Sequence, residues 1–187
     1  MNILFVSLGC DKNLADTELM LGGLRRRGYS FTDDEAQADI AVVNTCCFIG
    51  DAKEESINTL LELAERKDGG KLKVLIAAGC LAQRYQEEIR KEIPQVDAVV
   101  GTMAIEEIGE AVEEALAGKG RNHFRELNAP LSLSRDRVLT TGGHYAYLKI
   151  AEGCGRHCTY CIIPKVRGDY RSIHLEELVA QARALGE

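Results

Sequence analysis

The sequence lacks any apolar run that approaches the roughly 20 residues needed by a membrane-spanning helix. Its first residues, Met1 to Phe5, form a short apolar stretch without the basic segment or the cleavage site of a secretory signal peptide. Tryptophan, internal repeats and low-complexity tracts are absent as well. The first two absences argue against a membrane-spanning or secreted protein, and the composition is otherwise that of an ordinary soluble one.

Cysteine is the unusual feature of the composition. The chain has seven cysteines, at positions 10, 46, 47, 80, 154, 158 and 161. An odd number without a signal peptide argues against a disulfide framework and favours metal or redox chemistry in a reducing compartment. We therefore expect a cytoplasmic protein that uses its thiols as ligands.

Charge is distributed unevenly along the chain. Residues 1–120 hold 13 basic and 22 acidic side chains, a net charge of −9, whereas residues 121–187 hold 10 and 7, a net charge of +3. At 187 residues, the length suits one domain, or one domain and part of another. We predict an N-terminal domain over 1–120, a linker over 121–143 and a second domain from 144 to 187.

Strand and helix patterns alternate through the first 120 residues. Short apolar runs predict strands over 2–8, 39–44, 73–78 and 97–100. Amphipathic stretches that end in basic residues or glycine predict helices over 13–27, 51–67, 81–93 and 104–117. This alternation predicts an α/β fold with a doubly wound parallel sheet and helices on its faces.

Three cysteines follow three of the predicted strands. Cys10, Cys46 and Cys80 each come one to three residues after an apolar run, beside small residues that leave room for a bulky ligand. The carboxyl ends of parallel strands meet at the edge where such sheets bind ligands. Three thiolates there suit an iron–sulfur cluster, or a zinc ion with one open position. The alternative is that they are buried structural cysteines, which is also the interpretation of Cys47.

The other three cysteines form a compact motif. A predicted strand over 145–151 leads into C-x3-C-x2-C, formed by Cys154, Cys158 and Cys161. Such a loop can place three thiolates around one face of a cubane cluster and leave the fourth iron open as a reaction site. The alternative, zinc, needs a fourth ligand, and His157 is poorly placed to supply it because it adjoins Cys158.

Basic side chains gather around this motif, at positions 156, 165, 167 and 171. They suit stabilisation of a negatively charged cluster, or contact with the phosphates of ribosomal or transfer RNA. A solvated charged face is an equally good interpretation, and the sequence does not separate the three.

The spacing of the second motif, with Tyr160 before its last cysteine, resembles the signature of the radical S-adenosylmethionine enzymes. Wider segments resemble the methylthiotransferase family within that group: SLGCDKN at 7–13, NTC at 44–46, AGC at 78–80, HYAYLKI at 144–150 and CIIPKVRG at 161–168. The segments 11–13 and 144–150 are similar to the branch that modifies an aspartate of small ribosomal subunit protein twelve. The branch that modifies transfer RNA usually has Gln-Met-Asn after its first cysteine.

The resemblance implies two 4Fe–4S clusters and S-adenosylmethionine. Cys154, Cys158 and Cys161 would hold the radical-generating cluster, whose open iron takes S-adenosylmethionine. Its reduction by an external electron donor yields a radical that abstracts hydrogen from the aspartate β carbon. The auxiliary cluster, which presents or donates sulfur, would be held by Cys10, Cys46 and Cys80. A second S-adenosylmethionine supplies the methyl group.

The family continues beyond the motifs found in this chain, through a barrel of strand–helix units and a small β domain. We therefore expect 144–187 to be the first strand, cluster loop and first helix (175–185) of a partial TIM barrel, in a fragment of a longer enzyme. Two features depart from the family pattern, Cys47 and the pair Ile173–His174. Two alternatives remain: a transfer-RNA adenosine methylthiotransferase, and a non-enzymatic module that binds zinc or a cluster.

Overall fold

The first part of the chain folds around a six-stranded parallel sheet. The computed structural model describes residues 1–70, 72–131 and 136–186. The strands lie in the order β2 (Ser30–Phe31), β1 (Asn2–Ser7), β3 (Ile40–Thr45), β4 (Val74–Ala78), β5 (Ala98–Val100) and β6 (Asn122–His123). All neighbouring pairs are parallel. The predicted parallel sheet is therefore confirmed, while the edge strand β2 is too short for an apolar pattern to reveal.

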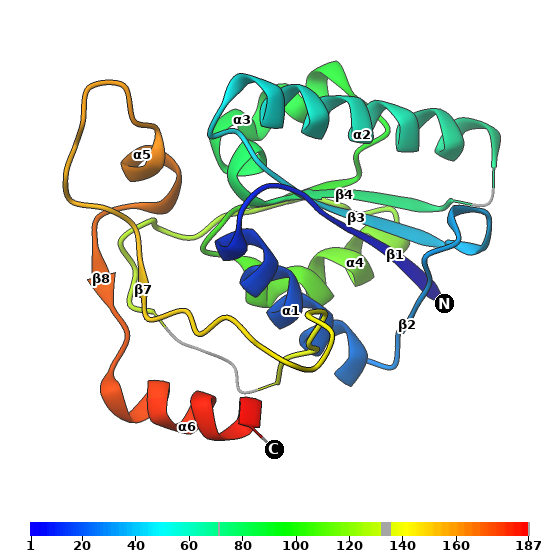
Figure 1. Cartoon of the computed structure of the whole chain (residues 1–187). Helices are drawn as coiled ribbons and strands as arrows, with labels where there is room; N and C mark the ends of the chain where they lie inside the picture. Colours follow the sequence, from blue (N-terminus) through cyan, green and yellow to red (C-terminus); the bar gives the residue numbers. More distant parts are fainter. Residues whose placement is uncertain (71, 132–135, 187) are drawn as a thin grey trace.

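Helices cover both faces of this sheet (Figure 1). One face carries α1 (Asp11–Arg26) and α4 (Ile108–Leu116), and the other carries α2 (Gly50–Gly69) and α3 (Gly79–Glu92). Two short 3-10 turns are η1 (Glu35–Gln37) and η2 (Ile105–Glu107), and the second occupies the beginning of the predicted helix over 104–117. The doubly wound arrangement predicted from the alternation is thus the one observed.

Successive strand residues face opposite layers of the core, because side chains alternate across a sheet. Ile40 and Val42 pack with Met20 and Leu24 of α1, whereas Ala41 and Val43 belong to the layer under α2 and α3. Every residue of β3 and β4 is buried. Burial on both sides explains why these strands read as continuous apolar runs instead of alternating ones.

The helices α1 and α3 begin closer to their strands than the sequence indicates. The first residue of α1 is Asp11, with Cys10 at its N-cap, and α3 begins at Gly79. The predicted starts were positions 13 and 81. As a result, Cys10 and Cys80 lie at helix N-termini, directly over the carboxyl edge of the sheet.

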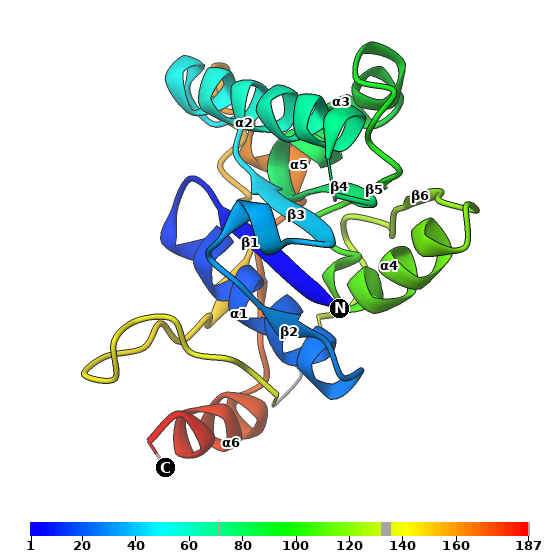
Figure 2. The ribbon, with the colours of Figure 1, turned by 90° about the vertical axis from the view of Figure 1, so that its right-hand side faces the viewer.

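The rest of the chain packs alongside. It contains β7 (Ala151–Glu152), α5 (Ile163–Arg167), β8 (Arg171–Ser172) and α6 (Leu175–Gly186), and β7 pairs with β8 in antiparallel fashion. Figure 2 shows α6 on the α1 side, on the opposite side of the sheet from α2. The predicted helix over 175–185 is confirmed. The predicted linker, 121–143, contains residues 132–135, which lie outside the described residues.

The predicted strand over 145–151 is wrong for most of its length. Its carbonyl groups accept hydrogen bonds from side chains: Thr141 Oγ1 donates to the carbonyl of Tyr145, and Arg137 Nη1 donates to that of Tyr147. These contacts pair the segment with side chains of its own loop and not with a neighbouring strand, and only Ala151 and Glu152 form a strand. In the described part of the chain, no helix is long and apolar enough to cross a membrane.

Candidate metal centre

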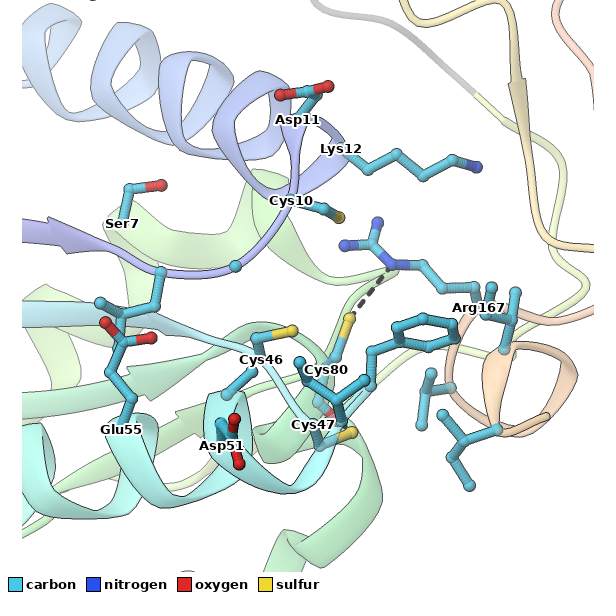
Figure 3. A pocket seen from close by; sticks show the side chains of 18 of the residues that line it. Ser7, Cys10, Asp11, Lys12, Cys46, Cys47, Asp51, Glu55, Cys80 and Arg167 are labelled. Carbon is cyan, nitrogen blue, oxygen red and sulfur yellow. Dashed lines mark hydrogen bonds between the residues drawn. The ribbon is translucent and has the colours of Figure 1, made fainter. Parts of the chain in front are cut away.

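The three strand-end cysteines meet at one pocket. The strand order reverses at β1, which lies between β2 and β3, and parallel sheets bind ligands at such a point. Cys10 follows β1, Cys46 follows β3 and Cys80 follows β4, and all three line a pocket of about 1230 Å³. Figure 3 shows their sulfur atoms turned toward the same space.

Two glycines make the tight turns that carry these cysteines. Gly9 and Gly79 both have a positive φ, +91° and +90°, which only glycine adopts without strain. A Cβ on Gly79 would lie 2.6 Å from the carbonyl oxygen of Thr45. The turn after β4 therefore passes close to the end of β3 because position 79 has no side chain.

Asn13 ties the loops together. Its side chain is fully buried, and Nδ2 donates to the carbonyl of Leu8 at 2.9 Å and to that of Thr45 at 3.0 Å. Those residues lie just before Cys10 and Cys46. On the α2 side, Ser56 Oγ accepts from the backbone N–H of Cys46 at 2.9 Å. The backbone beside two of the cysteines is thus held by buried side chains.

Arg167 reaches the same pocket from the end of α5. Its Nε donates to Cys80 Sγ at 3.3 Å, drawn as a dashed line in Figure 3, and Nη2 donates to Asn13 Oδ1 at 2.6 Å. Nη1 lies 2.6 Å from Asp16 Oδ2 and 3.0 Å from Glu152 Oε2. The residue is 3% exposed. The interpretation of Arg167 as part of a solvated or phosphate-binding face is therefore wrong. Its guanidinium is buried at the first cysteine site, where it donates hydrogen bonds to other residues of the protein.

Lysines reinforce the ion pairs around Arg167. Lys149 Nζ pairs with Asp16 Oδ1 at 2.7 Å and also with Glu152. Burial by itself raises the pKa of Glu152, but Arg167 and Lys149 outweigh burial and lower this pKa to about 2. Burial also raises the pKa of the Cys80 thiol, and the neighbouring Arg167 opposes that rise. The sequence offered no signal for the partnership of Arg167 with Asp16, because these residues lie 151 positions apart along the chain.

Cys47 differs from its neighbour. It is 3% exposed, belongs to the apolar layer under α2 and α3, and its Sγ donates to the carbonyl of Cys80 at 3.3 Å. Burial raises the pKa of its thiol to about 11. Figure 3 shows its sulfur turned away from that of Cys46. Cys47 also lines the pocket, but its thiol is packed and hydrogen-bonded in this arrangement.

The second motif lies beside the first site, on the loop between β7 and α5. Cys154 lines the same pocket as Cys10, Cys46 and Cys80. Cys158 and Cys161 line a neighbouring pocket of about 450 Å³, and Phe48 lines both pockets. The structure therefore places the two cysteine sets next to each other. The cysteines of the second motif are divided between two adjoining pockets.

The histidine beside this motif has another partner. His157 Nε2 lies 3.3 Å from Asp169 Oδ1. Within residues 1–70, 72–131 and 136–186, no three histidine, cysteine or acidic side chains lie close enough to hold one metal ion together. The described chain therefore has no preformed site for a single ion such as zinc.

Comparison with known proteins places the chain in a family. A profile of the uncharacterized protein family UPF0004 matches residues 2–101, which is more than half of the chain. The chain belongs to this family. The matched region runs from β1 to the end of β5 and includes Cys10, Cys46 and Cys80.

Similar curated proteins share one name, ribosomal protein uS12 methylthiotransferase RimO. The chain is 58% identical over 187 residues to the protein of Lachnoclostridium phytofermentans, and the match covers 100% of this chain and 42% of the relative. Identity is 49% over 181 residues with the protein of Trichlorobacter lovleyi, covering 96% and 40%. With that of Clostridioides difficile it is 45% over 187 residues, covering 100% and 42%. The chain thus spans about two fifths of the length of these relatives.

Proposed function

We propose that this chain supplies the two cluster sites of a radical S-adenosylmethionine methylthiotransferase. The enzyme would add a methylthio group to the β carbon of an aspartate in small ribosomal subunit protein twelve. The observation that carries the proposal is the pocket shared by Cys10, Cys46, Cys80 and Cys154. The RimO relatives, named for the same reaction on uS12, support the choice of substrate.

Each cysteine set has its own role in this proposal. Cys154, Cys158 and Cys161 would hold the 4Fe–4S cluster that binds S-adenosylmethionine, and Cys10, Cys46 and Cys80 would hold an auxiliary 4Fe–4S cluster. When bound, the two clusters supply reductive cleavage of S-adenosylmethionine and a source of sulfur. The chain itself would hold the two sites side by side. This proximity would bring the source of sulfur close to the place where the radical forms.

The shape of the first site suits an inorganic cluster. Gly9 leaves the space next to Cys46 Sγ open, because a Cβ there would lie 2.8 Å from that sulfur. The apolar side chains of Leu8, Ile162 and Val166 line part of the pocket. Several thiols around one pocket of about 1230 Å³ suit a multi-iron cluster, which takes its ligands at separate iron atoms.

The proposal includes partners outside the chain. An external electron donor must reduce the cluster of the second motif, and the ribosomal protein must bring its aspartate to the shared pocket. Arg156 and Lys165, which are both exposed, remain available for contact with RNA phosphates. The reducing conditions that free thiolates require place the protein in the cytoplasm.

Metal and sulfide analysis tests the proposal directly. The chain, reconstituted anaerobically with iron and sulfide, should bind about eight irons and eight sulfides, the content of two cubanes. Bound zinc without sulfide would refute the proposed enzymatic function. It would support the alternative of a non-enzymatic module that binds zinc.

Paired variants assign the two sites. We expect Cys154→Ala to remove only the cluster that cleaves S-adenosylmethionine, and Cys80→Ala only the other. Each should therefore retain about four irons. Loss of both clusters in either variant would contradict independent sites.

A chimera tests the reaction. This chain would replace the matching 42% of the Lachnoclostridium phytofermentans relative, to which it is 58% identical. The chimera should methylthiolate uS12, and the same chimera with Cys80→Ala should not. Activity on transfer RNA instead of uS12 would favour the transfer-RNA branch.

A further inference from the structure

Arg167 and its neighbour Gly168 together contact both cysteine sites. Its Nε donates to Cys80 Sγ at 3.3 Å, and the carbonyl of the next residue, Gly168, accepts from the backbone N–H of Cys154 at 3.1 Å. Gly168 has a φ of +75°, and a Cβ there would lie 2.8 Å from the carbonyl oxygen of Leu127. The backbone that carries Arg167 is therefore fixed between the two sites.

The guanidinium is held from several directions. Asp16, Glu152 and Asn13 accept from its Nη atoms at 2.6, 3.0 and 2.6 Å. These contacts leave Nε–H directed at the sulfur of Cys80. A planar guanidinium bound in this way keeps its orientation, which a flexible lysine ammonium would not.

A second buried arginine offers a comparison without a sulfur contact. Arg137 also joins the later part of the chain to α1, through Glu18 at 2.6 Å, and both side chains of that pair are almost completely buried. Its Nη1 donates to the carbonyl of Tyr147. Arg137 therefore forms a buried ion pair with α1, as Arg167 does, but it donates to a backbone carbonyl and not to a thiol.

We propose that Arg167 is a positioning residue that holds Cys80 Sγ and raises the reduction potential of the cluster bound at the first site. The inference rests on the proposed function, in which that cluster is 4Fe–4S. A cluster that takes up one electron becomes more negative, so a neighbouring cation and an N–H donor to a ligand sulfur stabilise the reduced form. Burial keeps solvent from screening this effect.

The test measures the potential of the first site alone. In the chain with Cys158→Ala and Cys161→Ala, only the first site keeps its three thiols. The cluster would be reconstituted anaerobically and titrated with dithionite, which supplies the one electron, and followed by electron paramagnetic resonance. In this background we expect Arg167→Gln to shift the equilibrium about tenfold toward the oxidised cluster, a fall of about 59 mV in midpoint potential.

Arg137→Gln is the matched control. It also removes a buried guanidinium from a carboxylate of α1, but it removes no donor from a thiol. We expect its midpoint potential to equal that of the background. An unchanged potential in Arg167→Gln, or an equal fall in both variants, would overturn the inference and leave the proposed function standing.

Two further outcomes are decisive. If the background assembles no cluster at all, the proposed function is wrong and this inference falls with it. If Arg167→Gln does not fold, Arg167→Lys keeps a cation opposite Asp16 and Glu152 while it loses the Nε–H donor to sulfur. That variant should also lower the midpoint potential, and an unchanged value would overturn the inference.

Discussion

Gly9 lies directly against Cys46. The Cβ that any other residue would carry at position 9 would lie 2.6 Å from the Cβ of Cys46 and 2.8 Å from its Sγ. One loop after β1 and another after β3 thus meet at a point where no side chain fits. This contact joins two of the three strand ends that form the first cysteine site.

Gly9→Ala should damage both stability and the first site. The positive φ costs about 1–2 kcal/mol for any residue with a Cβ, and overpacking against Cys46 adds about 1–3 kcal/mol. We expect a lower iron content at the first site, measured in the chain with Cys158→Ala and Cys161→Ala. Gly28→Ala is the control, because Gly28 has a φ of +83° and open space around it. Equal iron content in the two glycine variants would contradict this account.

Asn13→Ala should loosen the loops before Cys10 and Cys46. It removes the donor to the carbonyls of Leu8 and Thr45, and the loss of a buried hydrogen-bond partner costs about 1–3 kcal/mol. Urea denaturation should show this decrease in the free energy of unfolding. Asn128→Ala, at an exposed position that bonds to Asp169, should cost less than about 1 kcal/mol. A similar loss in both variants would mean that Asn13 contributes no more than a surface contact.

Cys47→Ala should leave cluster content unchanged. The Sγ of Cys47 donates to the carbonyl of Cys80 at 3.3 Å and lies in the apolar layer under α2 and α3, so the side chain is engaged in packing. We expect iron and sulfide equal to those of the unaltered chain, with a stability loss of about 1 kcal/mol. Cys46→Ala, at the adjacent position, should lose the first cluster. Loss of iron from Cys47→Ala as well as from Cys46→Ala would show that Cys47 is a ligand.

Glu107→Gln should make the free energy of unfolding depend less on pH between pH 6 and pH 3. Burial raises the pKa of Glu107, but hydrogen bonds from Arg125 and His123 lower it more, so the folded value lies below the ordinary 4.5. A depressed carboxyl pKa stabilises the fold above pH 4.5, and this contribution is lost as the pH falls below that value. The difference in unfolding free energy between parent and variant should therefore shrink from pH 6 to pH 3.

Urea denaturation across that pH range checks the Glu107 prediction. Glu106→Gln serves as the control, because Glu106 is more exposed and lies 3.4 Å from Arg125. Its effect should be smaller, because this carboxylate makes a single long contact at the surface. A pH-independent difference for Glu107→Gln would show that the variant acts through packing and not through the charge of this carboxylate.

Much of the first site could be predicted from local patterns. Apolar runs and amphipathic stretches indicate strands and helices in alternation, and alternation dictates a parallel sheet whose strand ends share one edge. The convergence of Cys10, Cys46 and Cys80 follows from that rule and from their positions after three strands. The segment 145–151 shows where a local pattern stops being sufficient: its residues favour a strand, but its carbonyls bond to Thr141 and Arg137.

The sequence by itself determined the alternating α/β order, the two cysteine sets and the resemblance that joins them to one chemistry, because these depend on periodicity and spacing. Only the tertiary structure decided that Arg167 belongs to the first site. Burial of a guanidinium requires carboxylates around it, and Asp16 lies 151 positions away in the sequence. Contacts between residues so far apart in sequence depend on how the whole chain packs, so no local pattern predicts them.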